Sequence, residues 1–173
     1  GLRDASSGEI SVLGLHPVKQ HAQLKEKIGI QLQESQLPDR IKVWEALDLF
    51  GSLFKKSLPY QPLLQELGLE EKANAYFDNL SGGQKQRLSI AMSLINDPQI
   101  VFFDELTTGL DPQARRNIWD LVKQVKQKGK TVILVTHFME EAEKLCDRVA
   151  IIDNGRMIAL DTPKNLILDL KKK

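Results

Sequence analysis

A serine followed by two glycines, in Ser81-Gly82-Gly83-Gln84, stands directly before a stretch with helical spacing. Glycines let the backbone approach a ligand closely, and a helix that starts there directs its free N–H groups and positive dipole end towards it. With the Ser81 hydroxyl, such a turn can hold an anionic oxygen, above all that of a phosphate. The Ser-x-x-Gln spacing is also that of a capping box, which needs no ligand. On these residues alone, both interpretations stay open.

Polar side chains also follow the apolar runs of the sequence. Asp104 and Glu105 come directly after the run 100–103, His137 follows a later run, and Gln33 follows an earlier one. Ligands of open parallel sheets gather at the carboxyl ends of strands, and adjacent residues there point in different directions. One carboxylate can therefore hold a hydrated Mg²⁺ while the other faces an attacking water, and an imidazole can stabilise a phosphate. Taken singly, each residue also fits a solvated turn or a structural role.

Alternating strands and helices predict an α/β fold with a parallel sheet. Short apolar runs predict strands at 9–13, 27–32, 100–103, 131–135, 149–153 and 157–160. Helical spacing predicts helices over about 41–54 and 84–95, one that starts after Asp111-Pro112 and ends at Gly129, and one at 138–146. Asn154-Gly155 is the favoured dipeptide of a tight hairpin turn. The all-helical stretch 41–95, set between strands, indicates an inserted subdomain.

Composition limits the class of protein. The 173 residues are 42% hydrophobic and 27% charged, which is enough for one domain with a sizeable core. Lysine and arginine number 24 against 23 acidic residues, so the net charge of +1 does not indicate a nucleic-acid partner. The single cysteine, Cys146, fits a reducing compartment, and no run approaches the roughly 18 apolar residues of a membrane span. We therefore expect a cytoplasmic protein.

The order of these segments is the most specific feature of the chain. A glutamine after a strand, a helical insertion, a Ser-Gly-Gly-Gln turn, a strand ending in Asp-Glu and a strand ending in His occur in sequence. In this order they resemble the nucleotide-binding domain of ABC transporters. The matching segments are Gln33 (the Q-loop), Leu80–Gln84 (the signature), Ile100–Asp104 (the Walker B strand), Glu105 (the catalytic glutamate), Gly109–Asp111 (the D-loop) and His137 (the switch histidine).

The resemblance implies a P-loop NTPase fold with a parallel sheet and an inserted helical subdomain. Residues 1–40 and 96–173 would be part of the catalytic core, and about 41–95 the helical signature subdomain. ATP and Mg²⁺ would be the cofactors, with Asp104 holding Mg²⁺ through water and Gln33 reaching the metal. Glu105 would polarise the attacking water and His137 would stabilise the charge on the γ-phosphoryl oxygens.

Partners also follow from the resemblance. Two such domains sandwich ATP head to tail, so Ser81, Gly82, Gly83 and Gln84 would face nucleotide held by a second nucleotide-binding domain, and Asp111 would join the two sites. A membrane-spanning permease subunit would place the protein on the inner face of the cell membrane. The sequences around the motifs, such as those at 107–112 and 136–142, are similar to the sequences of bacterial exporters of drugs, antibiotics or polysaccharide.

Two departures from the family pattern stand out. Leu106 occupies a position that is usually proline, and no G-x-x-x-x-G-K-[ST] loop, the Walker A motif that cradles phosphates, occurs in the sequence. We expect the sequence to begin just past the phosphate-binding helix, so that the domain is incomplete at its N-terminus. The isolated chain is then expected to be a marginal or associating monomer that does not turn over ATP.

Other readings remain. DNA-repair and chromosome-organising ATPases share the signature, but they insert a long coiled coil, and no heptad run lies between Gln33 and Leu80. A soluble translation-associated relative would usually carry two such domains. A non-catalytic module that supplies only its signature in trans to a partner ATPase is the alternative from another functional class.

Overall fold

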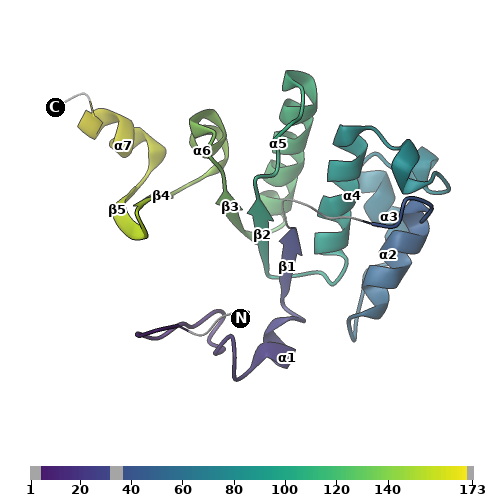
Figure 1. The fold of residues 1–173 in the computed structure, drawn as a ribbon, viewed down its shortest axis with the longest axis horizontal. Helices are drawn as coiled ribbons and strands as arrows, with labels where there is room; N and C mark the ends of the chain where they lie inside the picture. The colour runs from purple at the N-terminus through teal and green to yellow at the C-terminus, as the bar shows by residue number, and fades with distance from the viewer. Residues whose placement is uncertain (1–4, 32–36, 171–173) are drawn as a thin grey trace.

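The computed structural model describes residues 5–31 and 37–170, and Figure 1 shows a central sheet with helices behind it and to both sides. The predicted parallel sheet is confirmed. Its strands β1 (Ile28–Gln31), β2 (Ile100–Asp104) and β3 (Thr131–Val135) lie in the order β1-β2-β3. Ile28 pairs with Ile100, which in turn pairs with Thr131, so the carboxyl ends of the strands meet at one edge.

The two faces of this sheet differ in burial. Val101 and Phe103 of β2 point to a fully buried face, and Gln31 of β1 lies on the same face at 2% exposure. On the other face, Ile30 is 53% exposed and Val135 is 56% exposed. The covered face is therefore where the sheet contributes to the core.

The described residues between β1 and β2 form helices joined by loops, with one isolated bridge between Lys42 and Tyr76. The helices are α2 (Val43–Ser52), α3 (Tyr60–Glu66), the short 3-10 helices η1 (Glu70–Lys72) and η2 (Phe77–Asn79), and α4 (Gly82–Leu94). Figure 1 shows α2, α3 and α4 together on the β1 side of the sheet. Their buried leucines join the sheet residues in one continuous hydrophobic core, so the helical insertion and the sheet are stabilised together.

Helix α4 lies unusually close to β1. A Cβ added to Gly29 would stand 1.9 Å from the carbonyl oxygen of Ser93 in α4. No side chain fits into that distance, so the glycine allows α4 to pack directly on β1.

The second half of the chain follows the predicted alternation. Helix α5 (Pro112–Gln127) packs against β3 and α4, and α6 (Met139–Leu145) packs against α5. The strands β4 (Val149–Asp153) and β5 (Arg156–Asp161) form the expected hairpin, with Asn154 and Gly155 both at positive φ (47° and 74°), followed by α7 (Pro163–Leu170).

The N-terminal region differs from the expectation. The predicted strand at 9–13 is wrong, because the structure has only an isolated bridge between Val12 and Leu15, followed by the short helix α1 (His21–Leu24). An alternating pattern alone does not make a strand where no neighbouring strand supplies the ladder of hydrogen bonds. Across the described part of the chain, no helix combines the length and the apolar content needed to cross a bilayer.

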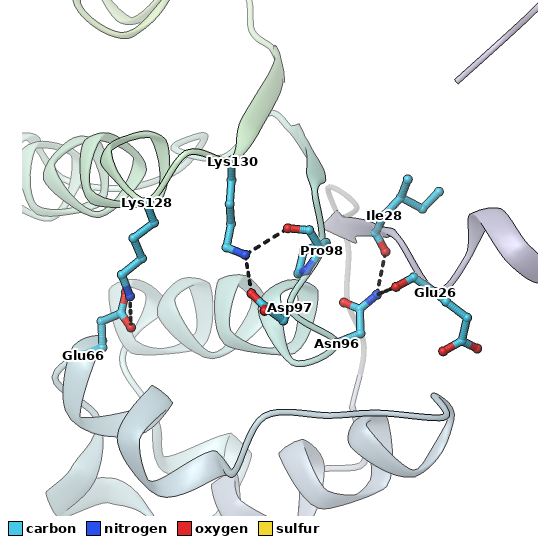
Figure 2. A network of polar contacts seen from close by, with 8 residues as sticks. All are labelled: Glu26, Ile28, Glu66, Asn96, Asp97, Pro98, Lys128 and Lys130. Atoms are coloured by element: carbon cyan, nitrogen blue, oxygen red, sulfur yellow. Dashed lines mark hydrogen bonds and ion pairs between the residues drawn. The ribbon is translucent and has the colours of Figure 1, made fainter. Parts of the chain in front are cut away.

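A polar network joins the segments that precede β1, β2 and β3 (Figure 2). The buried amide of Asn96 donates to the carbonyl oxygens of Ile28 at 3.0 Å and Glu26 at 3.4 Å. Lys130 binds Asp97 and the carbonyl of Pro98 across the loop before β2. These contacts hold together the segments that lead into β1, β2 and β3.

Candidate functional site

Glu105 and His137 meet at the carboxyl edge of the sheet. The Glu105 amide donates to the carbonyl of Val135 at 2.9 Å, which extends the β2–β3 pairing by one residue. Oε1 of Glu105 then lies 3.4 Å from Nδ1 of His137, and the Glu105 side chain is 28% exposed. Thr108 donates to the other carboxylate oxygen of Glu105 at 3.3 Å. A carboxylate held in this way beside an imidazole can accept a proton from a water molecule.

The backbone of Glu105 is strained. Its φ of 48° lies in the left-handed region, which is uncommon for a residue with a side chain. Such strain typically costs on the order of 1–3 kcal/mol and persists only where the surroundings enforce it. Here the hydrogen bonds from the Glu105 amide to Val135 and from the Thr108 hydroxyl to the carboxylate hold the residue, and the carboxylate lies beside His137.

Asp104 precedes this pair in the chain, and a hydrogen bond from its backbone amide holds it in place. Its amide donates to the side-chain oxygen of Gln31 at 3.2 Å, and Gln31 is almost fully buried. No cluster of three or more histidine, cysteine or acidic side chains suited to a metal occurs among the described residues. A single half-buried carboxylate fits Mg²⁺ that arrives with a nucleotide, because Mg²⁺ commonly binds through one or two carboxylates and substrate phosphates. Gln33, the other predicted magnesium contact, lies outside the described residues.

The Ser-Gly-Gly-Gln turn caps α4 as the capping-box reading predicts. The Gln84 amide donates to Oγ of Ser81 at 3.3 Å, and the Ser81 amide donates to Oε1 of Gln84 at 2.9 Å. In the cap the Ser81 hydroxyl acts as an acceptor, so its own proton can still be donated to a ligand. Capping and phosphate binding are therefore compatible at this turn.

A cavity of about 330 Å³ lies where α4 and α5 begin. The signature turn and the loop before α5 line it together: Ser81, Gly82, Gly83, Arg87, Gly109, Leu110, Asp111, Ala114, Asn117 and Ile118. The helices approach closely here, since a Cβ on Gly83 would lie 3.4 Å from Cβ of Ala114. The N-terminus of α4 and Arg87 bring positive charge to this cavity, whereas the Asp111 carboxylate caps the N-terminus of α5 and brings negative charge.

Asp111 is the N-cap of α5. Its carboxylate accepts from the amides of Ala114 and Gln113, each at 2.9 Å. The hydrogen bond from the Ala114 amide is the largest cause that holds the pKa of Asp111 below its usual value. The residues singled out in the sequence thus lie in two places: Asp104, Glu105 and His137 at the sheet edge, and Ser81, Gly82, Gly83 and Asp111 around the cavity.

Several supporting residues were missed by sequence reasoning. Gln31 holds Asp104, Thr108 holds Glu105, and a buried contact joins Thr107 to Glu141. Gln31 could have been found from the sequence, because it is a polar residue inside an otherwise apolar strand. Thr107, Thr108 and Glu141 carried no comparable signal, because polar residues in a loop or in the first turn of a helix are usually exposed.

The comparisons with known proteins fit this geometry. A family model described as ABC transporter matches residues 1–108. The chain belongs to the ABC transporter family. Among curated ABC proteins, the Nod factor export ATP-binding protein I of Neorhizobium galegae is 44% identical over 98% of this chain and 50% of its own length. The protein of the same name from Burkholderia lata is 43% identical over 96% of this chain and 57% of its own length. The chain spans about half the length of the curated relatives it matches.

A solved ABC protein confirms the predicted fold class. This structure, an ATP binding subunit of an ABC transporter, superposes with a TM-score of 0.83 and is 26% identical. The match covers 99% of this chain and 73% of that chain. The parallel sheet with its helical insertion is therefore the ABC ATP-binding fold.

Proposed function

We propose that the protein is an ATP-hydrolysing subunit of an ABC transporter that powers export through a membrane partner. The observation that carries the proposal is the contact of 3.4 Å between the Glu105 carboxylate and the His137 imidazole at the carboxyl edge of a parallel sheet. Export is favoured because the relatives that align over nearly the whole chain carry export in their names.

Mg-ATP is the proposed substrate, and the residues at the sheet edge take different parts. Asp104 would hold the Mg²⁺ that arrives with ATP, and Gln33, which lies outside the described residues, would contribute to the same metal and to the attacking water. Glu105 orients that water and accepts its proton. His137 donates a hydrogen bond to the γ-phosphoryl oxygens, on which negative charge increases as the bond to the β-phosphate breaks.

The cavity between α4 and α5 is proposed to act across an interface. Ser81, Gly82, Gly83 and Gln84 would contact the γ-phosphate of ATP bound to a second nucleotide-binding domain. Asp111 would join the two sites through the loop that also carries Glu105. The cap geometry supports this role, because the Ser81 hydroxyl acts in it as an acceptor and keeps its own proton for a ligand at the N-terminus of α4.

The helical insertion is proposed as the docking surface for a permease on the inner face of the membrane. Trp44, Phe50 and Phe54 are half-buried, and the neighbouring Leu49 and Leu53 are 50% and 59% exposed. A partly exposed apolar surface of this kind suits the cytoplasmic helix of a membrane subunit. No nucleic-acid partner is proposed.

The test is ATP hydrolysis by the complete protein that the gene encodes. We expect Mg-dependent phosphate release that falls about 10²- to 10³-fold in Glu105→Gln, which should retain ATP. Glu143→Gln, a change of the same type at an exposed carboxylate of α6, serves as the control and should hydrolyse ATP normally. The 173-residue chain alone, which has no G-x-x-x-x-G-K-[ST] loop, should not turn over ATP. A complete protein that is inactive, yet stimulates hydrolysis by a partner, would instead support the non-catalytic alternative.

A further inference from the structure

A buried carboxylate lies behind the sheet edge. Glu141 of α6 has an exposed fraction of 0%, although glutamate is seldom fully buried. Its Oε1 accepts a hydrogen bond from the Thr107 hydroxyl at 3.0 Å and another from Nε1 of Trp119 at 2.9 Å. Thr107 is also fully buried, and Trp119 is 4% exposed.

These three side chains join three different segments. Thr107 belongs to the loop after β2, Trp119 to α5, and Glu141 to the first turn of α6. Helices α5 and α6 are in contact, and Figure 1 shows α6 beyond the carboxyl end of β3. The loop runs directly into α5, whereas Glu141 follows Trp119 by 22 residues and Thr107 by 34 residues. The shared carboxylate oxygen therefore joins α6 to both the loop and α5.

Stability alone does not account for this arrangement. Burial of a carboxylate is costly, and apolar residues of similar volume often stabilise a core more. In addition, Oε2 of Glu141 has no hydrogen-bond partner among the described residues. A group that is expensive to bury and only half satisfied indicates a role in positioning.

The network lies next to both members of the pair at the sheet edge. Thr107 follows Glu105 by two residues, and Glu141 follows His137 by four residues. A second contact leads to the same place, because the Phe138 ring lies 4.1 Å from the His137 ring and 4.4 Å from the Arg115 guanidinium of α5. Both ends of the Glu105–His137 contact are thus attached to α5.

We propose that Glu141, through Thr107 and Trp119, is a positioning residue that holds Glu105 and His137 at their working distance. The inference rests on the proposed ATPase function. Loss of the network would let α6 and the loop shift separately. A displacement of about 1 Å in reacting groups can lower turnover on the order of 10²-fold, with little effect on substrate binding.

The first test compares variants of the complete protein that differ by single groups. Thr107→Val keeps the shape of the side chain but removes the donor, whereas Thr107→Ser keeps the donor. We expect kcat to fall about 10-fold in Thr107→Val and to stay near wild type in Thr107→Ser, with KM for ATP unchanged in both. Wild-type kcat in Thr107→Val would overturn the proposal.

A second series changes Glu141 itself. Glu141→Ala removes the shared acceptor and should lower kcat on the order of 10²-fold. Glu141→Gln retains an acceptor oxygen and should restore kcat to within about threefold of wild type. Equal loss in both variants would show that the shared oxygen does not matter. If Glu141→Ala fails to fold, Thr107→Val and Glu141→Gln still decide.

A spectroscopic measurement separates this proposal from the proposed function. In the complete protein labelled at histidine, the NMR resonance of His137, assigned by its loss in His137→Gln, reports the surroundings of the imidazole. It should shift in Thr107→Val and remain in place in Thr107→Ser, whether or not the protein hydrolyses ATP. An unchanged resonance in Thr107→Val would overturn the positioning role, while absence of ATP hydrolysis in wild type would overturn only the proposed function.

Discussion

Nδ1 of His137 lies 3.4 Å from Oε1 of Glu105, although 31 residues separate them in the chain. The parallel pairing of β2 with β3 produces this contact, because each residue follows the carboxyl end of its strand. The amide of Glu105 adds one more hydrogen bond to the carbonyl of Val135. The two side chains therefore form one unit rather than two independent groups.

Contact between Glu105 and His137 predicts that their substitutions are not additive. Glu105→Gln and His137→Ala should each lower kcat of the complete protein about 10²-fold or more, since each removes a group from the reacting centre. The double variant should be close to the worse single variant, because groups that act as a unit lose their effect together. Steady-state ATPase measurements decide the matter, and multiplication of the two single effects would show that the residues act independently.

The contact of Gly29 with α4 predicts strong destabilisation by the smallest possible side chain. Gly29→Ala places Cβ at 1.9 Å from the Ser93 carbonyl, so the helix or the strand must move. Overpacking typically lowers the free energy of unfolding by about 1–3 kcal/mol, and a clash with the backbone should lower it by at least the upper value. Gly51→Ala is the matched control in α2, because its Cβ would meet side chains and no backbone atom, with Ser57 at 3.2 Å and Ile95 at 3.5 Å. Urea unfolding of both variants should show a large loss for Gly29→Ala alone.

The buried amide of Asn96 predicts a larger effect than a surface ion pair nearby. Asn96→Ala leaves the carbonyls of Ile28 and Glu26 without this donor, which should cost about 1–3 kcal/mol of unfolding free energy. Lys128→Met breaks a pair with Glu66 in which the lysine side chain is 52% exposed, and should cost less than about 1 kcal/mol. Both values come from denaturant unfolding of the complete protein, and a reversed order would contradict this account of the network.

The cap of α5 predicts a stability difference that depends on pH. Amide hydrogen bonds, first that of Ala114, lower the pKa of Asp111 in the folded protein. A lowered pKa means that the charged form stabilises the fold above the usual aspartate value of about 3.9, and that this contribution disappears as the pH falls through the folded pKa. Asp111→Asn should therefore be less stable than wild type at neutral pH and approach it in acid. Urea midpoints measured from pH 7 to pH 3 test this, and a difference that stays constant with pH would contradict the role of charge.

Local features were predictable from the sequence because neighbouring residues determine them. The Ser81–Gln84 capping box, the Asp111-Pro112 start of α5 and the Asn154-Gly155 turn all formed as expected. Each depends on backbone dihedrals and hydrogen bonds within four residues. The failed strand at 9–13 shows the limit of this reasoning, because a strand needs a partner that local pattern does not supply.

The sequence by itself thus determined the alternation of strands and helices from β2 to β5, the family, and the polar residues that follow the strands. It did not predict α1 or α7, and its strand at 9–13 did not form. Only the tertiary structure decided which of these residues touch: Glu105 with His137, Gln31 with Asp104, and Glu141 with Thr107 and Trp119. The physical reason is that burial and contact distance at the sheet edge arise from packing between segments remote in the chain. No single stretch of sequence encodes such packing. The sequence alone therefore predicts that Glu141, in a short helix, is exposed, whereas packing against α5 buries it.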